Sequence, residues 1–422
     1  MRKPFLREGL PEFRRQQSEE TVCKTFSLEL ITPMMGGDSE SWVLHPEQPV
    51  RGQSVKGQLR FWWRTMQSES EPKKLLQKEN EIWGGKVTAE GKEERIQSPV
   101  KIAVLEQAVS RKSQAALNER GFAIEGDVIP VFVAFPVTSA IKNDKKEVLF
   151  IESLSFTLQV SCPASLWPVV EKTLKLWVLF GGIGARTRRG CGSLYCEELM
   201  AEFKDEKDIY QFVNAFQNNG KELDYPRIHG AVLAVKSAGT DTAAAWRGLI
   251  TSYSGFRQDR RPNKPTPGRS YWPEPDAIRT LTRQQSKNHK PEHPDGVWFP
   301  RAAFGLPIIT KFNTRGNGMG DPDPQVELAP VKAGRWPSPV ILKALRLPDG
   351  KALRMALVLK QAFPEALELK QGRLKFDVPV SANPFAPAPG KKMMKTRQGA
   401  ELRQDETLYQ ALFRELGLEE VK

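Results

Sequence analysis

Several residue types on which common functions depend are scarce in this chain. Its 422 residues include four cysteines, none in a CxxC pair, which argues against a structural zinc site and a disulfide framework. Four histidines leave few ligands or general bases for a metal or hydrolytic centre. No run approaches 18 apolar residues, and the basic N-terminal segment lacks the apolar core of a secretory signal. We therefore expect a cytoplasmic protein that uses no metal and no cofactor.

Positive charge is what the chain has in excess. It contains 63 lysines and arginines against 50 acidic residues, a net charge of +13. Such an excess favours a polyanionic partner, most often nucleic acid. The length exceeds what one compact core usually holds, so two domains are expected.

The first half of the chain has a recognisable order of elements. Residues 21–32 alternate as in a strand, and 54–66 have helical periodicity, with Ser54 as the expected N-cap. Further strands are expected at 100–107, 128–136 and 152–161, followed by a helix at 165–180 and a short strand at 193–200. This order is that of a split βαβ, ferredoxin-like unit, which is also the frame of RNA-recognition domains.

The second half repeats the same order. A strand at 227–237 and a helix at 241–253 precede a strand pair at 338–347 and 351–360, and a helix at 405–416 closes the chain. The sequence thus predicts an α+β protein with two tandem ferredoxin-like, RRM-like domains and long insertions. The expected boundaries are an N-terminal extension over 1–20, a first domain over 21–202, a helical connector over 203–225 and a second domain over 226–422. The polar segments expected as insertions or loops are 68–98, 109–121, 255–275, 284–300, 313–336 and 384–403.

The segment FGGIGARTRRGCGS, residues 180–193, is rich in glycine and arginine. Nucleotide-binding loops lie between a strand and a helix, whereas this one follows a helix and precedes a strand, which excludes a cofactor loop. We expect Gly181 and Gly182 to end the helix in the left-handed conformation. With Gly184, Gly190 and Gly192 they leave a backbone suited to a clamp on phosphates, and the alternative is a solvated basic turn. The arginines expected to bind RNA are Arg186, Arg188 and Arg189.

Two other segments combine cations with aromatic residues. On the helix at 54–66, Lys56, Arg60 and Arg64 recur every four residues beside Trp63, which could stack on a base. The alternative is that Trp63 belongs to the core and the cations cover it. The second segment precedes Tyr271 and Trp272, and its expected RNA-binding residues are Arg257, Arg260, Arg261 and Arg269.

Signals for catalysis are weak. His45 lies in a loop after the first strand, where a metal-independent endoribonuclease could place a general acid or base, but no partner is identifiable. We expect no catalytic residue, and a metal-independent ribonuclease that uses His45 is the alternative hypothesis. A scaffold whose basic loops bind acidic protein surfaces is the other alternative.

Three segments, LELITPMMGG, VRGQSVKGQLRFWWR and LFGGIGARTRRGCGSL, resemble the RAMP-superfamily subunit one of the Cmr, or type III-B CRISPR, effector complex. GRSYWPEPDAIR and RAAFGLPI resemble that family's second half. The resemblance implies two RRM-like domains in a non-nuclease subunit that holds RNA near the 3′ end of the CRISPR RNA, the paired target RNA, or both. It also implies other RAMP subunits as partners, a role in antiviral defence, and target cleavage by a different subunit. Arg269 and Arg279 would be the second-half counterparts of the first-half cations.

Overall fold

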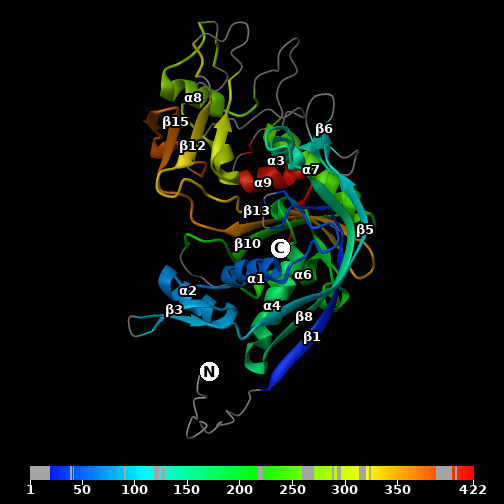
Figure 1. The fold of residues 1–422 in the computed structure, drawn as a ribbon. Coiled ribbons are helices and arrows are strands. Elements are labelled where there is room, and N and C mark those ends of the chain that lie inside the picture. The colour runs from blue at the N-terminus through cyan, green and yellow to red at the C-terminus, as the bar shows by residue number, and fades with distance from the viewer. Residues whose placement is uncertain are drawn as a thin grey trace, which may run out of the picture.

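In the part of the chain that the structure describes, the computed structural model contains three antiparallel sheets of four or five strands, with helices packed on them, and two antiparallel two-stranded sheets (Figure 1). In this view the first sheet lies below, the second in the middle and the third at the top. No described helix is long and apolar enough to cross a membrane. The structure describes the whole chain except residues 1–19, 39, 41, 90–91, 118–122, 125–128, 217–221, 259–269, 288, 292–295, 313–319, 323–324, 386–401 and 404–405.

The first sheet has the ferredoxin-like strand order. Its four main strands lie in the order β9-β1-β8-β5, with all neighbours antiparallel. In chain order they alternate with helices α1 and α4 as βαββαβ. The bounds are β1 Thr21–Leu30, α1 Gly52–Thr65, β5 Lys101–Gln114, β8 Leu149–Pro163, α4 Trp167–Phe180 and β9 Leu194–Tyr195, while the short β2, Met34–Met35, also pairs with β8.

The second sheet repeats this topology. Its order is β17-β10-β14-β13, again antiparallel throughout, with α7 and α9 as the two helices. The predicted α+β class with two tandem ferredoxin-like domains is therefore confirmed. The bounds are β10 Arg227–Ser237, α7 Thr242–Gln258, β13 Val340–Arg346, β14 Ala352–Lys360, α9 Leu408–Leu416 and β17 Glu419–Glu420.

The third sheet was not predicted. Its order is β11-β12-β15-β16, and helix α8 packs with it around a separate core that includes Ile278, Leu328 and Leu369. β12 lies inside 313–336, so the expectation of a loop throughout that segment was wrong. The strands are short and come from two distant insertions, which leaves no local pattern to reveal their pairing. The bounds are α8 Glu274–Thr282, β11 Ile308–Thr310, β12 Val326–Pro330, β15 Leu367–Gln371 and β16 Leu374–Asp377.

Two local predictions in the first domain were also wrong. The apolar run 128–136, expected as a strand, contributes to helix α3, Val131–Lys142, which buries Val133, Val137 and Ala140 at helical spacing. A continuous apolar run fits a buried strand and a buried helix equally well. Helix α1 begins at Gly52, and its N-cap is Arg51 without a side-chain hydrogen bond, so Ser54 is not the cap.

The polar insertions also contain regular structure. Residues 68–98 form helix α2 and the hairpin β3–β4, and β5 continues into the segment expected as an insertion at 109–121. The expected connector contains helix α6. The remaining bounds are α2 Pro72–Trp83, β3 Gly85–Ala89, β4 Lys92–Ile96, β6 Ala116–Leu117, β7 Ala123–Ile124, α5 Glu197–Met200 and α6 Glu206–Asn214.

The two ferredoxin-like domains share one hydrophobic core and a buried cation. The largest cluster of buried residues joins Phe26 and Leu174 of the first domain to Ile341 and Met355 of the second. Lys343 on β13 is fully buried, and its ammonium donates hydrogen bonds to the carbonyls of Val178 and Gly181 at the C-terminal end of α4. A cation is favourable there because the last carbonyls of a helix carry partial negative charge. Lys343 thus fastens the second domain to the first.

Candidate nucleic-acid interface

The glycine-rich loop at 181–193 is a packed joint between the two domains. Thr32, in the first domain, donates from Oγ1 to the Gly190 carbonyl with a distance of 2.6 Å. Trp246, in the second domain, donates from Nε1 to the Arg189 carbonyl with a distance of 2.7 Å. A Cβ on Gly190 would lie 2.8 Å from the Trp246 ring and 2.9 Å from the Leu342 carbonyl oxygen. The alternative of a freely solvated turn therefore does not describe this loop.

The first two glycines of the loop are required for space and not for a left-handed backbone. Gly181 has φ −93°, in the extended region, so the predicted left-handed C-cap was wrong. A Cβ on Gly181 would lie 2.4 Å from Trp62 Nε1, and one on Gly182 would lie 2.6 Å from the Gly192 carbonyl oxygen. The left-handed positions come later, at Gly184, Gly190 and Gly192.

Two of the three arginines of the loop lie over aromatic rings. Arg189 donates to the Val340 carbonyl at 2.8 Å, and its guanidinium lies 4.9 Å from the centre of the Tyr253 ring. The Arg188 guanidinium lies 5.4 Å from the centre of the Phe61 ring on α1. Arg186 has φ 62°, a left-handed conformation that is uncommon for a side-chain-bearing residue, and its buried Nε donates to no described acceptor. Arg186 is therefore the member with an unused donor.

Arg257 and Arg301 extend this group into the second domain. Each donates to the other's backbone carbonyl, at 3.2 and 3.4 Å. Arg257 lies over the Phe304 ring, and Arg301 pairs with the buried carboxylate of Glu274, with Nε–Oε2 at 3.1 Å. We call the five side chains of Arg186, Arg188, Arg189, Arg257 and Arg301 the arginine row.

The electrostatics of the arginine row reflect crowded, partly buried cations. Burial, reinforced by the charge of Arg189, lowers the pKa of Arg186 and lowers that of Arg188 to about 10. Burial also lowers the pKa of Arg257, with smaller opposing and reinforcing effects from Tyr253 and Arg301. Among the described residues, Glu274 supplies the only carboxylate in an ion pair with the row. The site therefore carries several charges that an anion would stabilise.

The basic stripe on α1 has a different character from the one predicted. Trp63 is only 2% exposed and packs in the core, so its predicted role in stacking on a base is wrong for this structure. Arg60 pairs with the buried carboxylate of Glu79 on α2 and donates to Asn80 Oδ1 at 2.9 Å and to the Gly84 carbonyl at 3.1 Å. Arg64 pairs with the same carboxylate at 3.2 Å. These two arginines hold α2 against α1.

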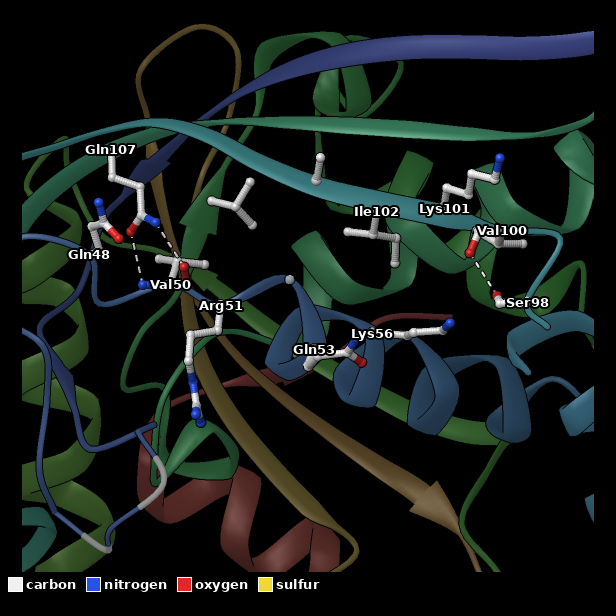
Figure 2. Close-up of a pocket in the computed structure, with 13 residues that line it drawn as sticks. Gln48, Val50, Arg51, Gln53, Lys56, Ser98, Val100, Lys101, Ile102 and Gln107 are labelled. Carbon is white, nitrogen blue, oxygen red and sulfur yellow. Dashed lines mark hydrogen bonds between the residues drawn. The ribbon is translucent and has the colours of Figure 1, made fainter. Parts of the chain in front are cut away.

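Lys56, the first cation of the stripe, has no such partner. Among the described residues none forms an ion pair or hydrogen bond with its ammonium. Burial, and then the charge of Arg60, lowers its pKa. It lies in a groove between the start of α1 and β5 (Figure 2). Of the predicted stripe, Lys56 is the member that stays available.

The remaining predicted residues fall into two groups. Arg279 makes a bidentate contact with Asp321, at 2.7 and 3.1 Å, and lies over the Phe312 ring, so it holds the third sheet's lobe together. Arg260, Arg261 and Arg269 lie outside the described residues.

His45 lies in an exposed loop. Its Nδ1 accepts hydrogen bonds from the backbone N–H groups of Glu47 at 3.2 Å and Gln48 at 3.0 Å. This arrangement uses one ring nitrogen to shape the turn and leaves Nε2 for any other contact. The part of the chain that the structure describes contains no group of three His, Cys, Asp or Glu side chains able to hold a metal ion.

Sequence reasoning missed Arg301. It lies in RAAFGLPI, 44 residues after Arg257, and only the fold brings the two together. The one signal was the resemblance of that segment to a family motif, which gave the arginine no role.

The first domain matches a known protein family. Residues 27–195, from β1 to β9, match the family model of the RAMP superfamily. The chain is similar to the apo crystal structure of Cmr1 from Pyrococcus furiosus, with 17% identity and a TM-score of 0.46 over 82% of this chain and 90% of that one. It is also similar to a chain of the type III-B Cmr-beta complex bound to cognate target RNA, with 13% identity and a TM-score of 0.44 over 94% and 100% of the two chains. No curated protein matches.

Proposed function

We propose that this chain is a non-catalytic RNA-binding subunit of a type III-B CRISPR effector complex, acting in antiviral defence. It contacts the RNA backbone near the 3′ end of the CRISPR RNA, the paired target RNA, or both. The RAMP match over the first domain supports the superfamily, and the motifs in both halves support the more specific assignment. Its partners are the CRISPR RNA, the target RNA and other RAMP subunits.

The observation that carries this proposal is the charge imbalance of the arginine row. Five guanidinium groups meet at the junction of two domains, with the carboxylate of Glu274 as the paired acid. Guanidinium groups present several donors in a fixed plane, which suits phosphate oxygens. A string of phosphates would supply negative charge beyond the one paired carboxylate that the described residues provide, and an acceptor for the buried Nε of Arg186.

The mechanism is electrostatic and independent of base sequence. Each cation that neutralises a phosphate releases condensed counterions, so affinity falls with salt concentration by a slope of about 0.7 per contact on a single strand. Contacts of this kind position the RNA without reading its bases.

The test replaces the two loop arginines that make no backbone contact across the domains. RNA binding to the full chain is measured by fluorescence anisotropy at several salt concentrations, with Arg186→Ala plus Arg188→Ala as the variant. The matched control is Arg335→Ala plus Arg373→Ala, two exposed arginines of the third sheet's lobe. We expect the row variant to bind more than tenfold more weakly, with the salt slope reduced by about 1.4. Equal affinity of the two folded variants would overturn the proposal.

The non-catalytic part has its own test. Purified chain is incubated with CRISPR-repeat RNA in the absence of metal, beside His45→Ala. We expect both to leave the RNA intact. Cleavage that disappears in His45→Ala would replace the proposal with the endoribonuclease.

A further inference from the structure

A groove beside α1 is separate from the arginine row. Its volume is about 650 Å³, within the range of about 300–1,000 Å³ typical of ligand sites. Its walls are the loop before α1, the first turns of α1 and the first half of β5 (Figure 2). The thirteen residues drawn around it in Figure 2 include Arg51, Lys56 and Lys101 and no acid. An anionic ligand would meet no like charge on these walls.

The Gln107 side chain holds the loop before α1 against β5 with the two backbone hydrogen bonds that a neighbouring strand would make. The amide of Gln107 on β5 accepts from the Val50 N–H at 2.9 Å and donates to the Val50 carbonyl at 2.8 Å (Figure 2). Gly52 lets the helix start close to β5, since a Cβ there would lie 3.3 Å from the Ile102 carbonyl oxygen. The loop, the helix and the strand are therefore held at a fixed separation before any ligand arrives.

The polar and apolar groups of the groove are segregated. Figure 2 shows the Ile102 side chain extending from β5 toward α1, and Gln53 and Lys56 projecting from α1 below it. The Lys101 side chain extends from the opposite side of β5. A chain that crosses the strand edge would therefore meet one ammonium on each side. Between them lie the aliphatic side chain of Ile102 and the amide of Gln53, for which the described residues supply no hydrogen-bond partner.

From this arrangement we propose that the groove seats one nucleotide of single-stranded RNA, with its base against Ile102 and its phosphate at Lys56. Gln53 faces the base edge, because an amide can both donate and accept a hydrogen bond there. Lys101 contacts the phosphate of the neighbouring nucleotide across the strand edge. This proposal rests on the proposed function and adds to it a place where the RNA is held by its base as well as its backbone.

Two matched pairs of variants test the groove by anisotropy with a single-stranded RNA on the full chain. Ile102→Trp fills the groove, and Leu105→Trp places the same ring on an exposed position of β5 outside it. Lys56→Ala removes the groove cation, and Lys74→Ala removes an exposed helix cation elsewhere. We expect Ile102→Trp to weaken binding at least fivefold without changing the salt slope. Lys56→Ala should weaken binding severalfold and reduce the slope by about 0.7, while both controls stay within twofold.

Three results would overturn the inference. If Ile102→Trp and Lys56→Ala bind RNA as tightly as their controls, the groove is not an RNA site, and the proposed function is unaffected. Absence of RNA binding by the unmodified chain would overturn both proposals. Uridine or adenosine monophosphate that binds the groove as tightly as the RNA, detected by competition, would show a site for a free nucleotide instead.

Discussion

The arginines of α1 and the loop arginines of the arginine row are each close together in the sequence, but they have different surroundings. Arg60 and Arg64 both reach the carboxylate of Glu79, 19 and 15 residues later, whereas Arg186, Arg188 and Arg189 meet aromatic rings, carbonyls and each other. The difference is the carboxylate of Glu79, which lies on α2 in the insertion at 68–98. Where that acid is buried beside the cations, they hold helices together, and where it is missing they stay available to an external anion. Clusters of arginine in a sequence therefore need their carboxylates located before they are assigned to RNA.

The largest expected effect on stability is at Arg60, one of the two arginines of α1 that pair with Glu79. Arg60→Ala leaves the buried Glu79 with Arg64 alone, and removes two further hydrogen bonds. We expect a loss of about 3–5 kcal/mol in the free energy of unfolding, because an incompletely paired buried charge is costly. Urea denaturation measures it, with Arg51→Ala, a more exposed pair, as control. The RNA affinity of the folded variant should be unchanged. A loss of RNA affinity without a loss of stability would show that Arg60 binds RNA instead of holding α2 against α1.

Arg279 provides a second paired arginine, in the lobe of the third sheet. Arg279→Ala removes a bidentate contact with Asp321, and we expect a loss of about 2 kcal/mol. The exposed Arg373→Ala, in the same lobe, should change stability little. A double-mutant cycle with Asp321→Ala measures the coupling of the pair, and a coupling near zero would contradict the assignment.

Lys343 is a third kind of cation, which among the described residues is held by backbone carbonyls, and its effect on stability depends on pH. Burial lowers its pKa well below 10.5, so the unfolded chain binds more protons than the folded one between the lowered pKa and 10.5. The stability of the native chain relative to Lys343→Met should therefore rise with pH in that window, by at most about 1.4 kcal/mol per pH unit. Denaturation of both proteins at several alkaline pH values measures the difference. A constant difference would mean that Lys343 keeps its ordinary pKa.

The smallest effect on stability is expected within the arginine row. Arg188→Ala removes a contact with the Phe61 ring, worth about 0.5–1 kcal/mol, and no ion pair among the described residues. Thermal unfolding should therefore shift by only a few degrees, while RNA affinity falls. Arg188→Lys keeps the charge and is the matched variant. A large destabilisation would assign Arg188 to the fold instead.

Patterns within single elements gave much of the fold. Strand alternation at 21–32 and 227–237 and the apolar stripe of α4 were enough to predict the ferredoxin-like order, since each signal lies within one element. Pairings between distant segments could not be predicted. The third sheet joins four short strands from two insertions, and the pairing of Arg60 with Glu79 depends on how α2 folds back.

The candidate site followed the same division. The loop arginines are neighbours in the sequence, but their position at a domain junction depends on contacts with Trp246 and Val340 from the second half. Trp63 lies between the cations of the stripe by helical spacing, which favoured base stacking and left the core as the alternative. The structure buries it beside Trp62, because α2 and its neighbours cover that side of α1.

The hydrogen bonds of Lys343 also bear on the order of events during synthesis. Its ammonium binds carbonyls that lie 165 and 162 residues earlier in the chain, at the end of α4. When the first domain has left the ribosome, those carbonyls still lack this donor, and the surface of the shared core is still open. The C-terminal end of α4 therefore gains these two hydrogen bonds only after β13 has been synthesised. Folding of the first domain is in this sense completed by translation of the second half.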